Sequence, residues 1–129
     1  MDTVEATRFL VESYPEVGPK YEELMRNWVL DAGGPGIYTV FGSTVGPLVF
    51  DRLVQTSEVD EAGLRRFFQV IEMLCKTGDR SVRNFVAVEV AEEVVTKPKE
   101  WLRTASRLMG PCFRRECARV EEHLRNQLR

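Results

Sequence analysis

Apolar residues recur along this chain at the three- and four-residue spacing of an amphipathic α-helix, in segments separated by Gly, Pro and Asp. The clearest segment begins at Asp60 and ends at Gly78. Its apolar face consists of Leu64, Phe67, Phe68, Ile71, Leu74 and Cys75. Similar segments cover residues 2–14, 18–28, 98–109 and 111–128. The pattern predicts an all-α fold with about six or seven helices, arranged as one compact bundle or a short helical array.

Short local signals predict where several of these helices begin and end. Asp2 and Glu5 have the spacing of a capping box, and Pro15 ends the first helix. Gly78 follows a basic last turn and suits a left-handed cap, after which Ser81 is predicted to start the next helix.

The segment from residue 81 to residue 95 is apolar on nearly all sides, which predicts a central helix. The alternation from Val86 to Val90 also permits a buried strand, but the flanking Ala and Glu residues and a span of about 16 residues favour a helix. Glu89, Glu92 and Glu93 form the one acidic edge of this helix.

Residues 37–41 are ambiguous because their β-branched and aromatic side chains suit a strand, yet no clear partner strand follows. We treat them as an apolar lead-in to a helix. Ser43 or Thr44 would cap that helix, and Pro47 would lie in its first turn.

Length and composition are those of one ordinary globular domain covering residues 1–129. The hydrophobic residues make up 43% of the chain and the charged residues 29%. We expect no transmembrane segment, because no apolar run approaches the roughly 18 residues of a membrane span. We expect no signal peptide, because the start at residues 1–5 lacks the basic residues and the apolar core of one. The expected location is therefore the cytoplasm. Three cysteines cannot all pair within one chain, and nothing in the sequence indicates export, so reduced thiols are predicted.

Charge is unevenly distributed, although the formal net charge is only −2. Residues 1–60 hold ten acids and four bases, and residues 61–129 hold ten acids and fourteen bases. The two parts could steer a charged partner, but complementary packing of two groups of helices explains the asymmetry better.

No motif predicts catalysis, and we expect no metal and no cofactor. Cys112, Cys117 and His123 could suggest a metal site, but the cysteine spacing does not fit a zinc knuckle and no fourth ligand is close in sequence. Cys117 lies on an apolar stripe, which favours packing in the core. The loop at residues 33–36 lacks the Lys and Ser or Thr of a phosphate-binding loop.

Several short motifs nevertheless resemble a known family. They are Phe9, Tyr14-Pro15-Glu16, Tyr21, Val40-Phe41-Gly42, Thr77-Gly78-Asp79, the run from Val82 to Val88, and Met109-Gly110-Pro111. Together they resemble a family of small bacterial all-helical domains of uncharacterised biochemistry, some of which are thought to be toxin-immunity proteins. The Gly-Asp-x-x-Val-x-Asn stretch at residues 78–84 also resembles the inter-helix turn of HEAT-like repeats.

The resemblance implies a non-catalytic protein-interaction domain of the immunity type, which would bind and occlude a cognate bacterial toxin. Glu89, Glu92 and Glu93 could cover a basic, nuclease-like cleft, with Tyr38 and Trp28 as aromatic anchors.

The alternative is a HEAT-like adaptor or regulatory module whose basic C-terminal helices bind an acidic protein or nucleic acid. Residues 97–129 hold nine bases and four acids. The negative net charge and the interspersed glutamates argue against a dedicated nucleic-acid binder. We expect no membrane partner, and the sequence does not predict an oligomeric state.

Overall fold

The computed structural model describes residues 1–28 and 34–128, and its regular structure is helical, with no strand among these residues. In chain order the elements are α1 (Thr3–Ser13), η1 (Pro15–Val17), α2 (Gly18–Asn27), α3 (Ile37–Ser43), η2 (Gly46–Phe50), α4 (Asp51–Gln55), α5 (Glu61–Thr77), α6 (Arg80–Phe85), η3 (Val86–Ala91), α7 (Glu92–Val95), α8 (Lys99–Leu108) and α9 (Pro111–Gln127). The predicted all-α bundle is therefore confirmed.

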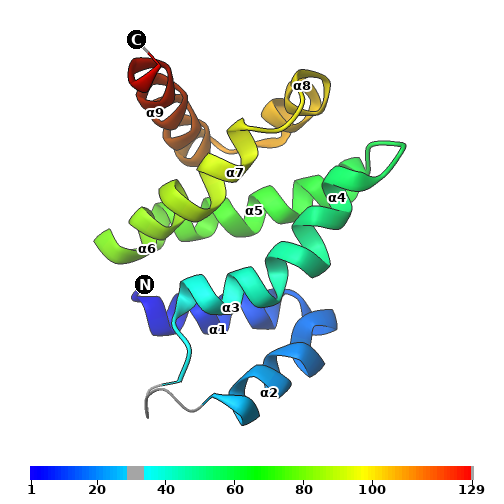
Figure 1. Ribbon diagram of the computed structural model, residues 1–129, viewed down its shortest axis with the longest axis vertical. Coiled ribbons are helices and arrows are strands. Elements are labelled where there is room, and N and C mark those ends of the chain that lie inside the picture. Colours follow the sequence, from blue (N-terminus) through cyan, green and yellow to red (C-terminus); the bar gives the residue numbers. More distant parts are fainter. Residues whose placement is uncertain (29–33, 129) are drawn as a thin grey trace.

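The helices are stacked along the long axis of the molecule (Figure 1). The elements α1, α2 and α3 form one end, α5 and the segment from α6 to α7 lie in the middle, and α8 and α9 form the other end. α5 contacts α1, α6, η3, α8 and α9. It is thus the central helix, and the buried apolar side chains form one cluster from Ala6 to Cys117.

The apolar face predicted for α5 is the centre of the core. Leu64, Phe67, Phe68, Ile71 and Leu74 are all fully buried. The ring centroids of Phe68 and Phe113, on α9, lie 5.8 Å apart, and those of Phe67 and Phe50, on η2, lie 5.2 Å apart. Since aromatic side chains bury large apolar areas, these contacts stabilise the packing of α9 and η2 on α5.

The elements α6, η3 and α7 follow one another without a break and form one helix, called here helix 80–95. The prediction of a helix rather than a strand is confirmed, but its predicted start at Ser81 is wrong. The cap is Asp79, whose Oδ1 accepts the backbone N–H of Val82 at 3.0 Å. Gly78 is extended, with φ −71°, rather than left-handed. A Cβ at this position would overlap the carbonyl oxygen of Leu74. Glycine is therefore required because the Leu74 backbone lies so close, and not because the residue adopts a left-handed conformation.

Residues 37–41 are helical, because α3 begins at Ile37 after Gly36. The cap predicted at Ser43 or Thr44 is wrong, since the buried Thr44 hydroxyl instead donates to the carbonyl oxygen of Val40 at 2.7 Å. Helical turns continue beyond this point through η2, whose π-type turn contains Pro47. Because proline has no N–H to donate, a locally wider turn is a regular way to accommodate it within a helix.

The prediction that all the thiols are reduced is wrong for two of the three cysteines. Cys75 on α5 and Cys112 on α9 form a disulfide with a Cα–Cα distance of 6.0 Å, whereas Cys117 is free and buried. The packing of α5 against α9 brings together two residues that are 37 positions apart. Disulfides persist mainly in oxidising compartments, so this pair does not support the expected cytoplasmic location. Within the described residues, no helix combines the length and apolar character needed to cross a membrane.

Candidate functional site

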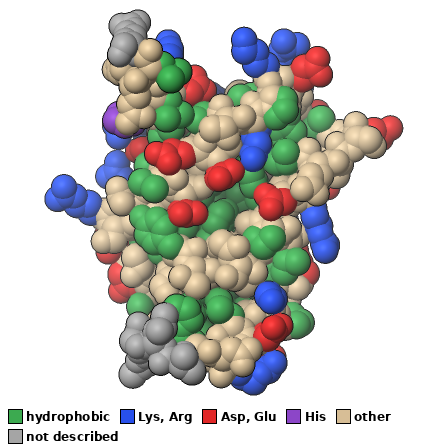
Figure 2. Space-filling view, viewed as in Figure 1, with side chains coloured by type: hydrophobic (Ala, Val, Ile, Leu, Met, Phe, Trp, Pro, Cys, Tyr) green, Lys and Arg blue, Asp and Glu red, His purple; other side chains and the backbone are tan. Residues whose placement is uncertain are grey.

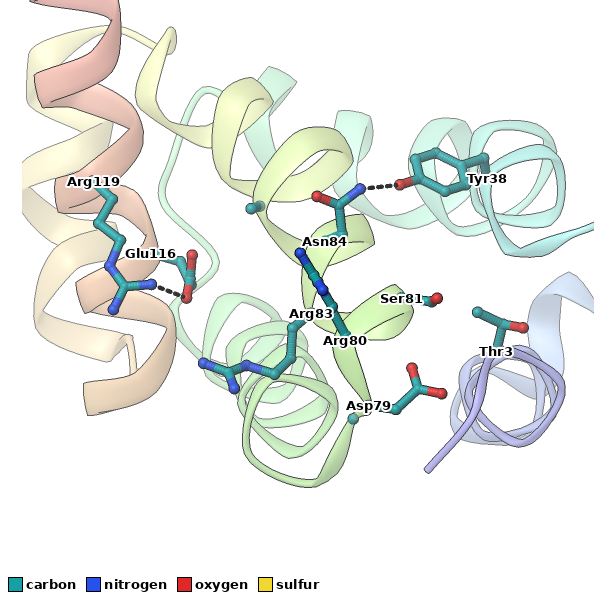
Figure 3. Close-up of a pocket in the computed structure, with 11 residues that line it drawn as sticks. Thr3, Tyr38, Asp79, Arg80, Ser81, Arg83, Asn84, Glu116 and Arg119 are labelled. Atoms are coloured by element: carbon teal, nitrogen blue, oxygen red, sulfur yellow. Dashed lines mark hydrogen bonds and ion pairs between the residues drawn. The ribbon is translucent and has the colours of Figure 1, made fainter.

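An open hollow of about 880 Å³ lies between α6, α3, α9 and the start of α1. Its charged and polar lining includes Arg80, Arg83, Asn84, Tyr38 and Arg119 (Figure 3). We call this hollow the arginine groove. Arg83 extends from α6 towards the side occupied by Glu116 and Arg119, whereas Tyr38 lies on the opposite side.

The stretch at residues 78–84 builds one wall of the arginine groove. Asp79 caps the helix, and Val82 points into the core and is fully buried. Successive residues of an α-helix are rotated by about 100° around its axis, so the residues that follow Val82 turn away from the core. Arg83 and Asn84 are accordingly exposed. Asn84 Nδ2 donates to the Tyr38 hydroxyl at 3.2 Å, which joins helix 80–95 to α3. The Tyr38 ring also meets Phe85 edge to face, with centroids 5.4 Å apart.

Some charged side chains of the arginine groove have partners within the described part of the protein, and others do not. Arg119 pairs with Glu116 through Nη1 and Oε1 at 3.2 Å, and Asp79 is occupied by its cap. Arg80 and Arg83 are exposed, and within the described residues their side chains make no hydrogen bond or ion pair. Two guanidinium groups are therefore available to a ligand.

Glu89, Glu92 and Glu93 surround a second hollow, of about 340 Å³, further along helix 80–95. Val88, Thr96 and Leu124 complete its lining, and we call this surface the acidic face. Figure 2 shows acidic side chains and hydrophobic side chains side by side in the middle of this view of the molecule. The structure thus gathers the three glutamates on one side of the helix, as the sequence indicates.

The two aromatic residues of the sequence prediction lie elsewhere. Tyr38 is 39% exposed, but it lines the arginine groove and not the acidic face. Trp28 directly follows α2, at the end of the molecule opposite α9, and is half-buried. The five candidate residues consequently do not form one continuous site.

The described residues offer no assembled catalytic or metal centre. No three potential ligands among His, Cys, Asp and Glu are grouped in that part of the chain. Cys112 is bonded to Cys75, and the ring of His123 contacts Gln127 Nε2 at 3.1 Å. Burial raises the pKa of Cys117 to about 12, so its thiol stays protonated and is a poor nucleophile at neutral pH.

Sequence reasoning missed Arg80, Arg83 and Asn84 as candidate site residues. Their spacing of three and four places them on one helical face, and that signal was readable from the sequence. Their approach to Tyr38 and Arg119 was not readable, because it depends on how α3 and α9 pack against helix 80–95.

Comparison of the chain with curated proteins and with solved structures found no match. A family model described as a domain of unknown function, DUF7674, matches residues 7–125. The matched residues include the whole lining of the acidic face and all of the lining of the arginine groove except Thr3. Since it extends over most of the sequence, the chain belongs to the DUF7674 family.

Proposed function

We propose that this protein is a non-catalytic interaction domain of the immunity type, which binds a basic toxin and occludes it through the acidic face. The observation that carries the proposal is the grouping of Glu89, Glu92 and Glu93 around one hollow. The hollow also has an apolar component, because Val88 is 43% exposed and Leu124 is partly exposed. An apolar centre with a charged margin is a common composition for protein interfaces.

The electrostatic state of the acidic face supports a basic partner. Glu93 pairs with Lys97 at 3.2 Å, whereas Glu89 and Glu92 make no ion pair within the described residues. Carboxylates that are not neutralised by their own chain attract a basic surface and orient it during encounter.

The test is affinity capture of the tagged protein from extracts of its native cells at moderate salt. We expect one stoichiometric partner with a basic toxin-like domain, and inhibition of that partner's activity when purified protein is added. E89Q/E92Q/E93Q should reduce recovery at least about fivefold, because interface charges contribute to both rate and affinity. The matched control is E12Q/E22Q/E58Q, which removes three exposed carboxylates outside the acidic face.

Equal recovery with the two triple variants would contradict the assignment of the acidic face. Capture of a partner whose activity is unaffected by binding would contradict the immunity role.

A second candidate function is an adaptor module of the HEAT-like kind, which binds an acidic protein or nucleic acid. The arginine groove favours this candidate, because Arg119 belongs to the basic C-terminal helix α9. Recovery of nucleic acid, with binding that weakens steeply as salt is raised, would support this function over the immunity role.

We also propose a cytoplasmic location. This location requires the Cys75–Cys112 disulfide of the structure to be reduced in cells, and alkylation of free thiols before lysis, followed by mass spectrometry, measures its state. A fully oxidised pair in freshly trapped cells would contradict the location.

A further inference from the structure

We propose that the arginine groove is a second binding site, which takes an acidic segment of a protein partner through Arg80 and Arg83. The groove is separate from the acidic face, because the two hollows share no lining residue. The inference therefore does not depend on the proposed immunity function, and it narrows the adaptor function, on which it rests, to an acidic protein partner.

The charges at the two ends of helix 80–95 have the signs that the helix dipole disfavours. Arg80 is the first residue of helix 80–95 and Arg83 lies within its first turn, where the dipole favours acids. Glu92 and Glu93 lie in its last turn, where the dipole favours bases. Both sets of charges oppose the dipole, and within the described residues only Glu93 among them has an ion-pair partner, Lys97. Residues that break a local stability rule are expected at functional surfaces.

Two other arginines of the same chain are engaged within the fold. Arg66 donates to the carbonyl oxygen of Ser13 and lies over the Tyr14 ring, and Arg114 donates to the carbonyl oxygens of Ser106 and Met109. These arginines hold neighbouring elements together. Arg80 and Arg83 make no such contact among the described residues, so their charges remain available for binding.

The polar groups of the arginine groove suit a ligand that carries carboxylates. A guanidinium group binds a carboxylate through two parallel hydrogen bonds, and the groove adds the Ser81 hydroxyl and the Asn84 amide as further polar groups. Nucleic acid fits less well, because a single strand binds by stacking successive bases on aromatic side chains. Among the described lining residues, Tyr38 is the only aromatic one, so successive bases have no stacking platform.

The experiment uses a fluorescein-labelled peptide of eight glutamates as the probe, titrated with the full chain at low salt and followed by fluorescence anisotropy. We expect saturable binding that R80Q/R83Q weakens about tenfold, because charge-assisted bidentate bonds are lost. R103Q/R107Q is the matched control, since it removes two exposed arginines of α8, and it should change the affinity less than about twofold. R80K/R83K should give an intermediate value, because lysine keeps the charge but not the planar fork.

Changes in backbone amide chemical shifts on addition of the peptide locate the binding site. We expect these changes at residues 80–87 and near Arg119. The proposal is overturned by an absence of saturable binding, by equal weakening in R80Q/R83Q and R103Q/R107Q, or by shifts confined to other surfaces. Tighter binding of a labelled single-stranded oligonucleotide with eight phosphates would also overturn it, because the site would then be one for nucleic acid.

Discussion

The carboxylate of Glu72 accepts the backbone N–H of Phe113 at 2.9 Å, so a side chain of α5 caps the first turn of α9. The other carboxylate oxygen accepts the backbone N–H of Cys112 at 3.0 Å, and Lys76 lies 3.9 Å from it. Glu72 is buried. The first N–H groups of a helix have no partner within the helix, and a carboxylate there also interacts favourably with the dipole.

We therefore expect Glu72→Ala to lower the free energy of unfolding by about 2–3 kcal/mol, because it leaves two buried N–H groups without an acceptor. Urea unfolding measures the loss. Glu12→Ala is the control, since Glu12 is exposed on α1, and it should change stability by less than about 0.5 kcal/mol. Similar values for both variants would show that the cap contributes nothing.

Gly110 is the N-cap of α9, and a Cβ there would overlap the side chain of Glu72. Gly110→Ala should cost about 1–3 kcal/mol, because Glu72 must move away from the N–H groups that it caps. Gly42→Ala is the matched control. A Cβ at Gly42 meets nothing within 4 Å, and alanine in a helix should raise the free energy of unfolding by up to about 1 kcal/mol. Thermal unfolding compares the two variants, and equal shifts would contradict the close approach.

The Cys75–Cys112 disulfide closes a long stretch of chain between α5 and α9. Its reduction should lower the free energy of unfolding by about 3–4 kcal/mol, because the unfolded chain regains conformational freedom. Denaturant unfolding with and without dithiothreitol measures the difference. The double variant C75A/C112A should be insensitive to dithiothreitol, and sensitivity in that variant would place the effect elsewhere.

Alkaline pH should destabilise the protein through Cys117. Burial, together with the charges of nearby Glu121 and Glu116, raises the pKa of its thiol to about 12. The unfolded thiol ionises at about pH 8.5, so the folded state holds its proton more tightly and loses stability as pH rises from about 9 towards 12. Unfolding free energies measured across this range should fall less steeply in C117A. Part of the decrease in unfolding free energy with pH should remain in C117A, because burial also raises the pKa of Tyr14 to about 12.

Periodicity predicted the parts of the fold that depend on one helix at a time. Leu64 to Leu74 follow the spacing of a buried stripe, and all the predicted members of that stripe are buried. Glu72 was missed because a single glutamate within such a segment looks like an ordinary exposed position. Its role depends on the N-terminus of α9, which lies about 40 residues away in sequence and beside it in space.

The same distinction applies to the disulfide and to the candidate sites. Glu89, Glu92 and Glu93 share a face through helical spacing alone, so the sequence grouped them correctly. The pairing of Cys75 with Cys112 requires α5 to pack on α9, and no spacing rule reveals it. The arginine groove likewise joins residues of α3, α6 and α9, so only the tertiary arrangement assembles it.

The central claim is that the charges of helix 80–95 left unpaired in the described part of the chain, which are Arg80, Arg83, Glu89 and Glu92, serve binding rather than folding. The most direct measurement is the free energy of unfolding of R80E/E92K, a variant that exchanges one base at the start of the helix for an acid and one acid at its end for a base. The account predicts a value equal to the unmodified protein or up to about 1–2 kcal/mol higher, because both changes agree with the helix dipole. A value lower by more than about 1 kcal/mol would contradict it, because these charges would then be part of what stabilises the fold.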